Sequence, residues 1–171
     1  MTFAQKYLEI LRKRGEDNTE LRKVYKIIRC KELYLLAYTN LYGNAGALTP
    51  GVEPEDTVDG MSLKRIDTIT KQLEQGAYRW KPVRRIYRVK RDGHRKRAIG
   101  MPGWNDKLLQ EVIRMVLEAY YEPQFRDSSH GFRPQRGCHT ALVTIKKKWT
   151  GVKWFIEGDI CHCFDSLEHD V

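Results

Sequence analysis

The sequence predicts an α+β fold in which helices predominate and strands are few. Three observations predict it. Apolar residues recur at helical spacing in several segments, one segment alternates like a strand and returns after an Asp-Gly turn, and an apolar run lies near the end of the chain. A chain of 171 residues with 41% hydrophobic and 31% charged residues can bury a sizeable core, so we do not expect disorder.

The first part of the chain predicts three helices. Residues 1–15 form a short amphipathic pattern that carries both acids and bases. Residues 19–41 follow the helical period after a threonine that can serve as N-cap, which predicts one long helix. A Gly- and Pro-rich segment, 42–62, leads to a third helix that Ser62 caps and Gly76 closes. That segment is long for a simple connection, so it is either flexible or lies on a ligand.

A basic β-hairpin is predicted in the middle of the chain. Residues 83–90 alternate as a strand, 92–93 supply Asp-Gly turn chemistry, and 96–100 form the returning arm. The chain has a net charge of +9, and the segment 79–97 holds this whole excess, with ten Lys or Arg against one acid. A charge concentrated in this way is typical of a surface that binds a polyanion.

The second half predicts two helices and a final strand. Asn105 can cap the clearest helix of the chain, which stops before Pro123. A polar loop, 125–137, precedes a helix over about 141–149, whose three consecutive lysines form a solvated face. The apolar run 154–156 predicts a closing strand.

Asp159 follows this last run directly. A carboxylate at a strand end can hold a hard cation such as Mg²⁺, and the backbone carbonyl of Ile160 can supply another oxygen. The alternative is that Asp159 caps a following helix. A two-metal site needs further carboxylates, and only Asp165, Glu168 and Asp170 follow in the chain. We therefore expect a chain that is cut within its catalytic domain and is inactive alone.

Cysteine usage and hydropathy indicate the compartment. The four cysteines have no CxxC spacing, so free thiols are favoured over a zinc site. The N-terminus lacks the apolar core of a signal peptide, and the sequence contains no apolar run of membrane-spanning length. We expect a cytoplasmic protein without a membrane partner.

Four sequence blocks carry a resemblance to a known family. In order, they are GNAGALTPGV, RRIYRVKRDGHRKRAIGMP, SSHGFRPQRG and WFIEGDICHCFD. Together they resemble the fingers and the beginning of the palm of a group II intron-encoded reverse transcriptase, or maturase. The resemblance implies that residues 1–150 are an N-terminal extension and a helix-rich fingers subdomain with the basic hairpin. Residues 151–171 are then the truncated start of a right-hand polymerase palm, including its first strand.

The resemblance also implies nucleotide-binding residues. Arg84, Lys90 and Arg97 contact the triphosphate of the incoming dNTP, and Phe164 packs against its sugar to exclude a 2′-hydroxyl. The chain has one residue more between Lys90 and Arg97 than the family pattern, so Lys96 is the alternative to Arg97. A solvated basic hairpin, and a core position for Phe164, are the structural alternatives.

Contacts to RNA or template are expected at seven positions: Gly46, Thr49, Gly51, Arg88, Phe132, Arg133 and Arg136. The glycines allow close approach of a sugar–phosphate backbone, and arginines donate to phosphate. The alternative for the first block is a flexible linker. For the third block, Phe132 lies in the core and both arginines pair with local acids such as Glu122 or Asp127.

The resemblance implies an RNA-directed DNA polymerase that uses two Mg²⁺ ions, with Asp159 as the first carboxylate ligand and Ile160 as a carbonyl ligand. Its partners are RNA template, intron RNA, DNA primer and deoxynucleoside triphosphates, and it assists intron splicing and mobility. The alternative is an RNA-binding splicing cofactor without catalysis of its own. The sequence does not predict an oligomeric state.

Overall fold

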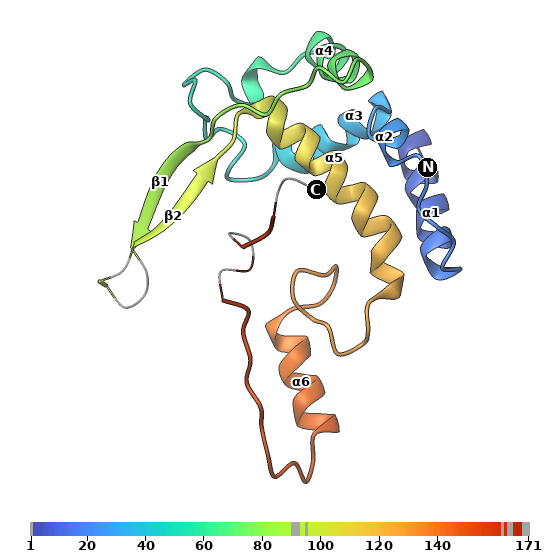
Figure 1. The fold of residues 1–171 in the computed structure, drawn as a ribbon, viewed down its shortest axis with the longest axis vertical. Helices are drawn as coiled ribbons and strands as arrows, with labels where there is room; N and C mark the ends of the chain where they lie inside the picture. Colours follow the sequence, from blue (N-terminus) through green and yellow to red (C-terminus); the bar gives the residue numbers. More distant parts are fainter. Residues whose placement is uncertain (1, 90–92, 95, 162, 164–165, 169–171) are drawn as a thin grey trace. The chain divides into compact units, whose positions relative to one another are not determined.

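The computed structural model of the chain describes residues 2–89, 93–94, 96–161, 163 and 166–168. The chain forms two compact units, residues 1–125 and 126–171. Unit 1 contains, in order, α1 (Phe3–Glu16), α2 (Val24–Ile27), α3 (Lys31–Tyr42), the 3-10 helix η1 (Val58–Gly60), α4 (Leu63–Glu74), β1 (Arg84–Val89), β2 (Lys96–Met101), α5 (Trp104–Tyr121) and the 3-10 helix η2 (Glu122–Gln124) (Figure 1). Unit 2 contains α6 (Cys138–Lys148). In the described residues, helices together with a two-stranded antiparallel sheet give an α+β architecture.

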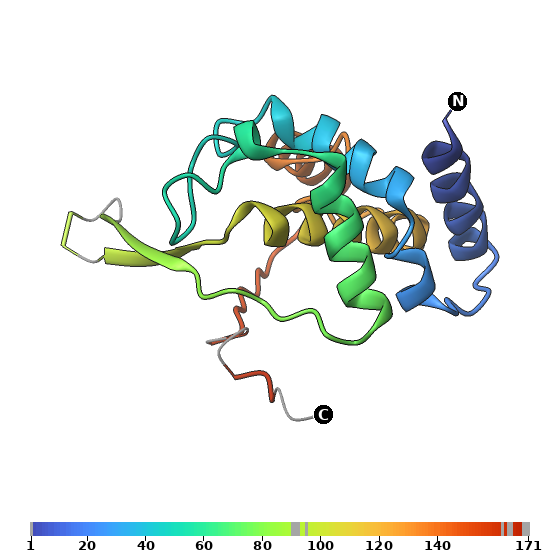
Figure 2. The same cartoon turned by 90° about the horizontal axis from the view of Figure 1, so that it is seen from above.

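The core of unit 1 is built around α5. Its apolar stripe is fully buried at Leu108, Leu109, Val112 and Val116. Helices α1, α3 and α4 all contact it, and in Figure 2 α4 crosses in front of α5. Burial of such a stripe is the main source of stability for an amphipathic helix. The core therefore fixes the end of α5 from which the hairpin emerges.

Local capping signals predicted the ends of α4 and the end of α5 correctly. Helix α1 begins at a capping box that was not predicted, in which Thr2 and Gln5 bond each other's backbone amides. Helix α4 begins after Ser62, whose hydroxyl accepts from the amide of Arg65, and Gly76 follows its end with φ +65. The end of α5 before Pro123 is confirmed as well.

The single helix predicted over 19–41 is wrong. Residues 19–23 lie outside any helix, Lys23 has φ 59, and the backbone is extended at Cys30 between α2 and α3. Tertiary bonds account for the breaks. The buried Tyr34 hydroxyl donates to the Ile28 carbonyl at 2.9 Å, and the Tyr120 hydroxyl donates to the Thr19 carbonyl at 2.9 Å.

The predicted N-cap of α5 is also wrong. The helix begins at Trp104 with Gly103 as cap residue, and Asn105 lies within its first turn. The Trp104 amide donates to Asp56 Oδ2 at 3.0 Å, so a carboxylate 48 residues away satisfies the helix end. A Cβ on Gly103 would lie 2.6 Å from the same oxygen, which explains the glycine.

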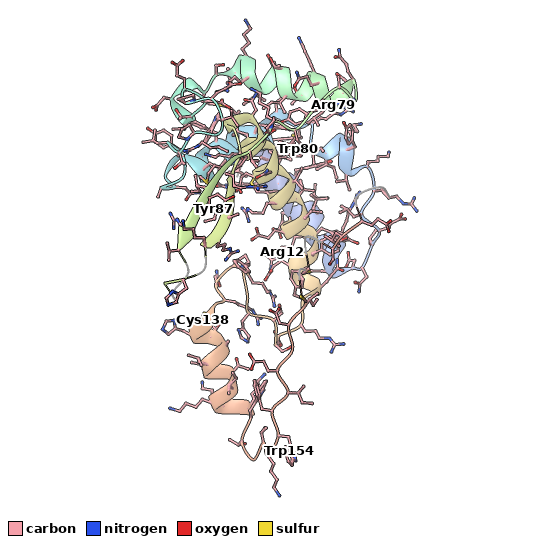
Figure 3. All side chains as sticks on the ribbon, turned by 60° about the vertical axis from the view of Figure 1, so that its left-hand side comes forward. Arg12, Arg79, Trp80, Tyr87, Cys138 and Trp154 are labelled. Carbon is pink, nitrogen blue, oxygen red and sulfur yellow. The ribbon has the colours of Figure 1, made fainter. Side chains whose placement is uncertain are left out.

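In unit 2, the predicted helix is confirmed as α6, but the predicted strand 154–156 is absent. This run lies outside any helix or strand, and Trp154 and Ile156 are 88% and 93% exposed. Figure 3 marks Trp154 on this run. A strand needs a hydrogen-bonded neighbour, and the described residues of the unit form no sheet with it. No helix in the described part of the chain is long and apolar enough to cross a bilayer.

Candidate nucleic-acid interface

The hairpin of β1 and β2 presents two different faces. Its antiparallel register pairs Arg84 with Met101 and Val89 with Lys96, and side chains directly opposite each other share a face. The Arg84 face consists of Arg84, Ile86, Arg88, Arg97, Ile99 and Met101. The Tyr87 face consists of Arg85, Tyr87, Val89, Lys96, Ala98 and Gly100. The hairpin extends away from the helices of unit 1 (Figure 2), and the predicted strands 83–90 and 96–100 are confirmed apart from their ends.

The register distinguishes Arg97 from its alternative, Lys96. Arg97 lies opposite Arg88 and hence on the same face as Arg84, whereas Lys96 lies opposite Val89 on the other face. Arg88 and Arg97 are both exposed, and neither side chain has a hydrogen bond or ion pair with any described residue. Like charges directly opposite each other destabilise a strand pair. An anion bound between these two arginines would relieve that repulsion.

Arg84 is engaged with the Gly-rich loop, which we define as residues 44–52. Its Nε and Nη2 donate to the carbonyl of Pro50 at 3.2 and 3.0 Å. From α5, Lys107 Nζ donates to the carbonyls of Gly46 at 2.9 Å and Thr49 at 2.5 Å. Three carbonyls of the loop thus accept hydrogen bonds from two cationic side chains. These bonds hold the loop in place, which disfavours the alternative of a flexible linker.

Lys107 is partly buried beneath this loop. Burial lowers the pKa of its ammonium group below the usual value because the charge loses hydration, and the nearby charge of Arg84 lowers it further. The carboxylate of Asp56 acts in the opposite direction. Lys107 therefore gives up some hydration to hold the loop, and no motif in the sequence marks this lysine.

The two predicted loop glycines lie in different surroundings. Gly51 is buried, and a Cβ there would meet the Gly103 amide nitrogen at 2.7 Å, so the glycine permits the loop to pack on the start of α5. Gly46 is exposed, with open space where a Cβ would stand. Thr49 is half-buried between them. Of the two glycines, Gly46 is the one whose backbone a ligand can reach.

Two buried carboxylates hold the segments of chain that lead into and out of the hairpin. Asp56, 5% exposed, accepts from Trp104 and from the guanidinium of Arg65. Asp106, 2% exposed, accepts from the Tyr78 hydroxyl at 2.5 Å and from the Lys81 amide at 3.1 Å. Burial and the bond to Asp106 raise the pKa of Tyr78. Neither carboxylate was predicted from the sequence, because the backbone amides from which they accept lie 48 residues from Asp56 and 25 residues from Asp106.

In unit 2, the loop 128–137 is folded by its own arginines. Arg133 donates to the carbonyls of Arg126 and Ser129 at 2.9 and 3.0 Å. Arg136 bonds the Asp127 carbonyl at 2.7 Å and its carboxylate at 3.0 Å, and lowers the pKa of that carboxyl. The local pairing of Arg136 with Asp127 is therefore present in the structure.

Phe132 does not lie in a core. Its side chain is fully exposed and its backbone has φ +56, a conformation that is rare for a bulky residue. The core alternative for Phe132 is thus wrong in this structure. An exposed ring held in a strained backbone is available for contact with another molecule.

Asp159 lies on an exposed stretch of unit 2. Its Oδ1 accepts from the amide of Ile160 at 2.9 Å, and no helix follows it among the described residues, so the helix-cap alternative is not seen there. Asp159 and Ile160 offer oxygen ligands of the kind that Mg²⁺ takes. Within the described ranges no three His, Cys, Asp or Glu gather around a cation site, so these residues do not complete a two-metal centre. The predicted positions Lys90 and Phe164, and the acids Asp165 and Asp170 that follow Asp159 in the chain, lie outside the described residues.

Comparisons with known proteins agree with the four sequence blocks. A family model described as reverse transcriptase (RNA-dependent DNA polymerase) matches residues 89–171. The chain is 46% identical over 164 residues to the group II intron-encoded protein LtrA of Lactococcus lactis subsp. cremoris, a match that covers 95% of this chain and 27% of that protein.

Two further relatives extend the comparison. An uncharacterized 91 kDa protein in the cob intron of Schizosaccharomyces pombe is 45% identical over 168 residues, covering 95% of this chain and 20% of that protein. Nuclear intron maturase 1 of Arabidopsis thaliana, a mitochondrial protein, is 26% identical over 157 residues, covering 82% of this chain and 22% of that protein. The chain thus spans about a quarter of the length of these relatives or less. It belongs to the group II intron-encoded reverse transcriptases, the family that its four sequence blocks resemble.

Proposed function

We propose that the complete protein copies RNA into DNA, and that this chain supplies surface for the RNA template and the incoming deoxynucleoside triphosphate. The observation that carries the proposal is the Arg84 face of the hairpin. Arg88 and Arg97 stand opposite each other there without an acidic partner among the described residues. A guanidinium fork suits phosphate oxygens, and the matched family is named for nucleotide polymerisation on RNA.

In this proposal, residues 1–150 act as extension and fingers and residues 151–171 begin the palm. Asp159 and the Ile160 carbonyl contribute ligands for Mg²⁺, which when bound activates the primer 3′-hydroxyl and stabilises charge on the phosphate. Because these residues do not complete a two-metal site, we expect no template-dependent primer extension by the isolated chain. Extension of a primer on RNA by the purified chain would contradict this part of the proposal.

The triphosphate assignment is tested with two neighbouring cations that lie on opposite faces. Arg97→Ala removes a charge from the Arg84 face, and Lys96→Ala removes one from the Tyr87 face. We expect equilibrium binding of a deoxynucleoside triphosphate to weaken in the first variant and to stay unchanged in the second. Equal effects of the two substitutions would show that only general charge matters.

The RNA assignment is tested through salt dependence. Each phosphate contact that is lost should reduce the slope of log affinity against log salt by about 0.7 for a single strand. Arg88→Ala together with Arg97→Ala should therefore flatten the slope by about 1.4. Replacing the exposed Lys147 and Lys148 of α6 provides a control with the same charge change, for which we expect an unaltered slope.

A second function is supported by one relative, which is named an intron maturase. In that case the chain binds intron RNA and assists splicing without catalysis of its own. Asp159→Asn in the longer protein would distinguish the two functions. Loss of DNA synthesis with intact splicing assistance would show that both functions exist and that only one needs this carboxylate.

A further inference from the structure

We infer that the Tyr87 face of the hairpin binds single-stranded RNA, with an unpaired base stacked on Tyr87. The inference rests on the proposed function, since it concerns the same hairpin, but it assigns residues that lie on the face opposite to Arg84. Figure 3 marks Tyr87 on this hairpin. The hairpin would then contact phosphate groups on its Arg84 face and an unpaired RNA base on its Tyr87 face.

The first support is the exposure of the Tyr87 ring. Its side chain is 61% exposed although it lies in the middle of β1. The residue directly opposite is Ala98 and the next along that strand on this face is Gly100, so small neighbours leave the ring uncovered. An aromatic ring in this setting is a platform on which a base can stack, because every base has a π-face.

The second support is the charge around the ring. Arg85 precedes Tyr87 on the same face of β1, and Lys96 lies diagonally across on β2, so that cations stand on either side of it. Both side chains are exposed, and neither shares a hydrogen bond or ion pair with another residue that the structure describes. Arg85 and Lys96 thus flank an aromatic platform with two positive charges, which match a strand whose phosphates alternate with bases.

The third support is the isolation of the hairpin. A two-stranded sheet is marginally stable in water unless another element packs on it. In the described part of the chain no third strand joins β1 and β2, and Val89 on the Tyr87 face is 60% exposed. Occupation of this face by a ligand would cover apolar surface that the fold leaves open.

The chemistry of the face selects among polyanions. The bases of a duplex are stacked on one another, so double-stranded RNA can offer phosphates to Arg85 and Lys96 but not a base face to Tyr87. A single strand can offer both. The proposal is therefore restricted to unpaired RNA, and duplex RNA serves as the comparison ligand.

The test uses this chain and fluorescence anisotropy of a short single-stranded oligouridine RNA. We expect Tyr87→Ala to weaken binding by about 5- to 150-fold, the range for the loss of one stacked base, without changing the salt slope. Tyr87→Phe should bind like the parent chain because it keeps the ring. Tyr87→Val keeps strand propensity without a ring and should bind as weakly as Tyr87→Ala, which excludes unfolding of the hairpin as the cause.

Two further measurements complete the test, one of the salt dependence of binding and one of the affinity for duplex RNA. Arg85→Ala should flatten the salt slope by about 0.7, and Tyr87→Ala should leave the affinity for duplex RNA unchanged. If Tyr87→Ala and Tyr87→Val bind like the parent while Arg88→Ala with Arg97→Ala binds weakly, the inference is wrong and the proposed function stands. If no hairpin variant binds more weakly, the hairpin is not the RNA interface and both fail. Equal losses for single strand and duplex would also overturn the stacking assignment.

Discussion

Replacement of Lys107 by Met should loosen the Gly-rich loop, residues 44–52. The substitution keeps the aliphatic stem and removes the ammonium group that donates to the carbonyls of Gly46 and Thr49. A hydrogen bond to a charged group contributes a net 1.5–3 kcal/mol or so. The Gly46 carbonyl belongs to an exposed residue and can bind water instead, whereas Thr49 is half-buried. We therefore count only the bond to the Thr49 carbonyl in full, and expect the free energy of unfolding to fall by about 2 kcal/mol.

Urea unfolding and hydrogen exchange measure this effect together. With a urea slope of roughly 1–3 kcal/mol per molar, a loss of about 2 kcal/mol lowers the unfolding midpoint by about 1 M. Amide exchange should accelerate first at Ala47, whose amide donates to the Asn44 carbonyl, and at Val58, whose amide donates to the Ala47 carbonyl. Lys64→Met on the exposed surface of α4 is the matched control, with an expected change within about 0.5 kcal/mol. Equal midpoints and equal exchange for the two variants would refute the reasoning.

Three further predictions concern packing, pH and the proposed chemistry. Gly51→Ala should destabilise the chain by about 1–3 kcal/mol because its Cβ would press on backbone, whereas Gly46→Ala has open space and should be neutral or slightly stabilising in thermal melts. Burial opposes ionisation of Glu111, but bonds from Arg114 and Asn40 outweigh it and lower its pKa below the ordinary 4.5. The stability advantage of the parent over Glu111→Gln should therefore be full above about pH 4.5 and disappear as the pH falls through the folded pKa, and urea titrations at several pH values test this. In the longer protein, Phe164→Val should lower the ratio of kcat/KM for deoxy- over ribonucleotides, and an unchanged ratio with a large loss of stability would indicate a core Phe.

Local signals allowed much of the fold to be predicted. A capping serine, an Asp-Gly turn and strict alternation act within a few residues, so α4 and the hairpin were correct in type and position. The break between α2 and α3 was missed because its stabilising partners, the hydroxyls of Tyr34 and Tyr120, reach carbonyls that periodicity does not reveal. The strand expected at 154–156 depends on neighbours that a short apolar run cannot specify.

The basic residues of the site could be predicted from the sequence, but the residues that hold its loop and helix in place could not. Alternation in the sequence places Arg84 and Lys90 on one face of the predicted strand. Lys90 lies outside the described residues, and the observed register places Arg97 on the face of Arg84. Asp56 and Lys107 gave no signal in the sequence. Each acts on backbone atoms at the other end of a long segment, and a single Asp or Lys in a polar stretch has no distinguishing pattern.

The contact between Arg84 and Pro50 does not prevent Arg84 from binding phosphate as well. A guanidinium group has five N–H donors in a planar fork. In the structure Nε and Nη2 both donate to the one Pro50 carbonyl, which uses two of these donors and leaves those of Nη1 and one of Nη2. A phosphate that approached along the Nη1 edge would find two parallel donors still available, the arrangement that favours bidentate binding. Arg84 can therefore hold the Gly-rich loop and contact a triphosphate at the same time, so that loop and nucleotide would be positioned by one side chain.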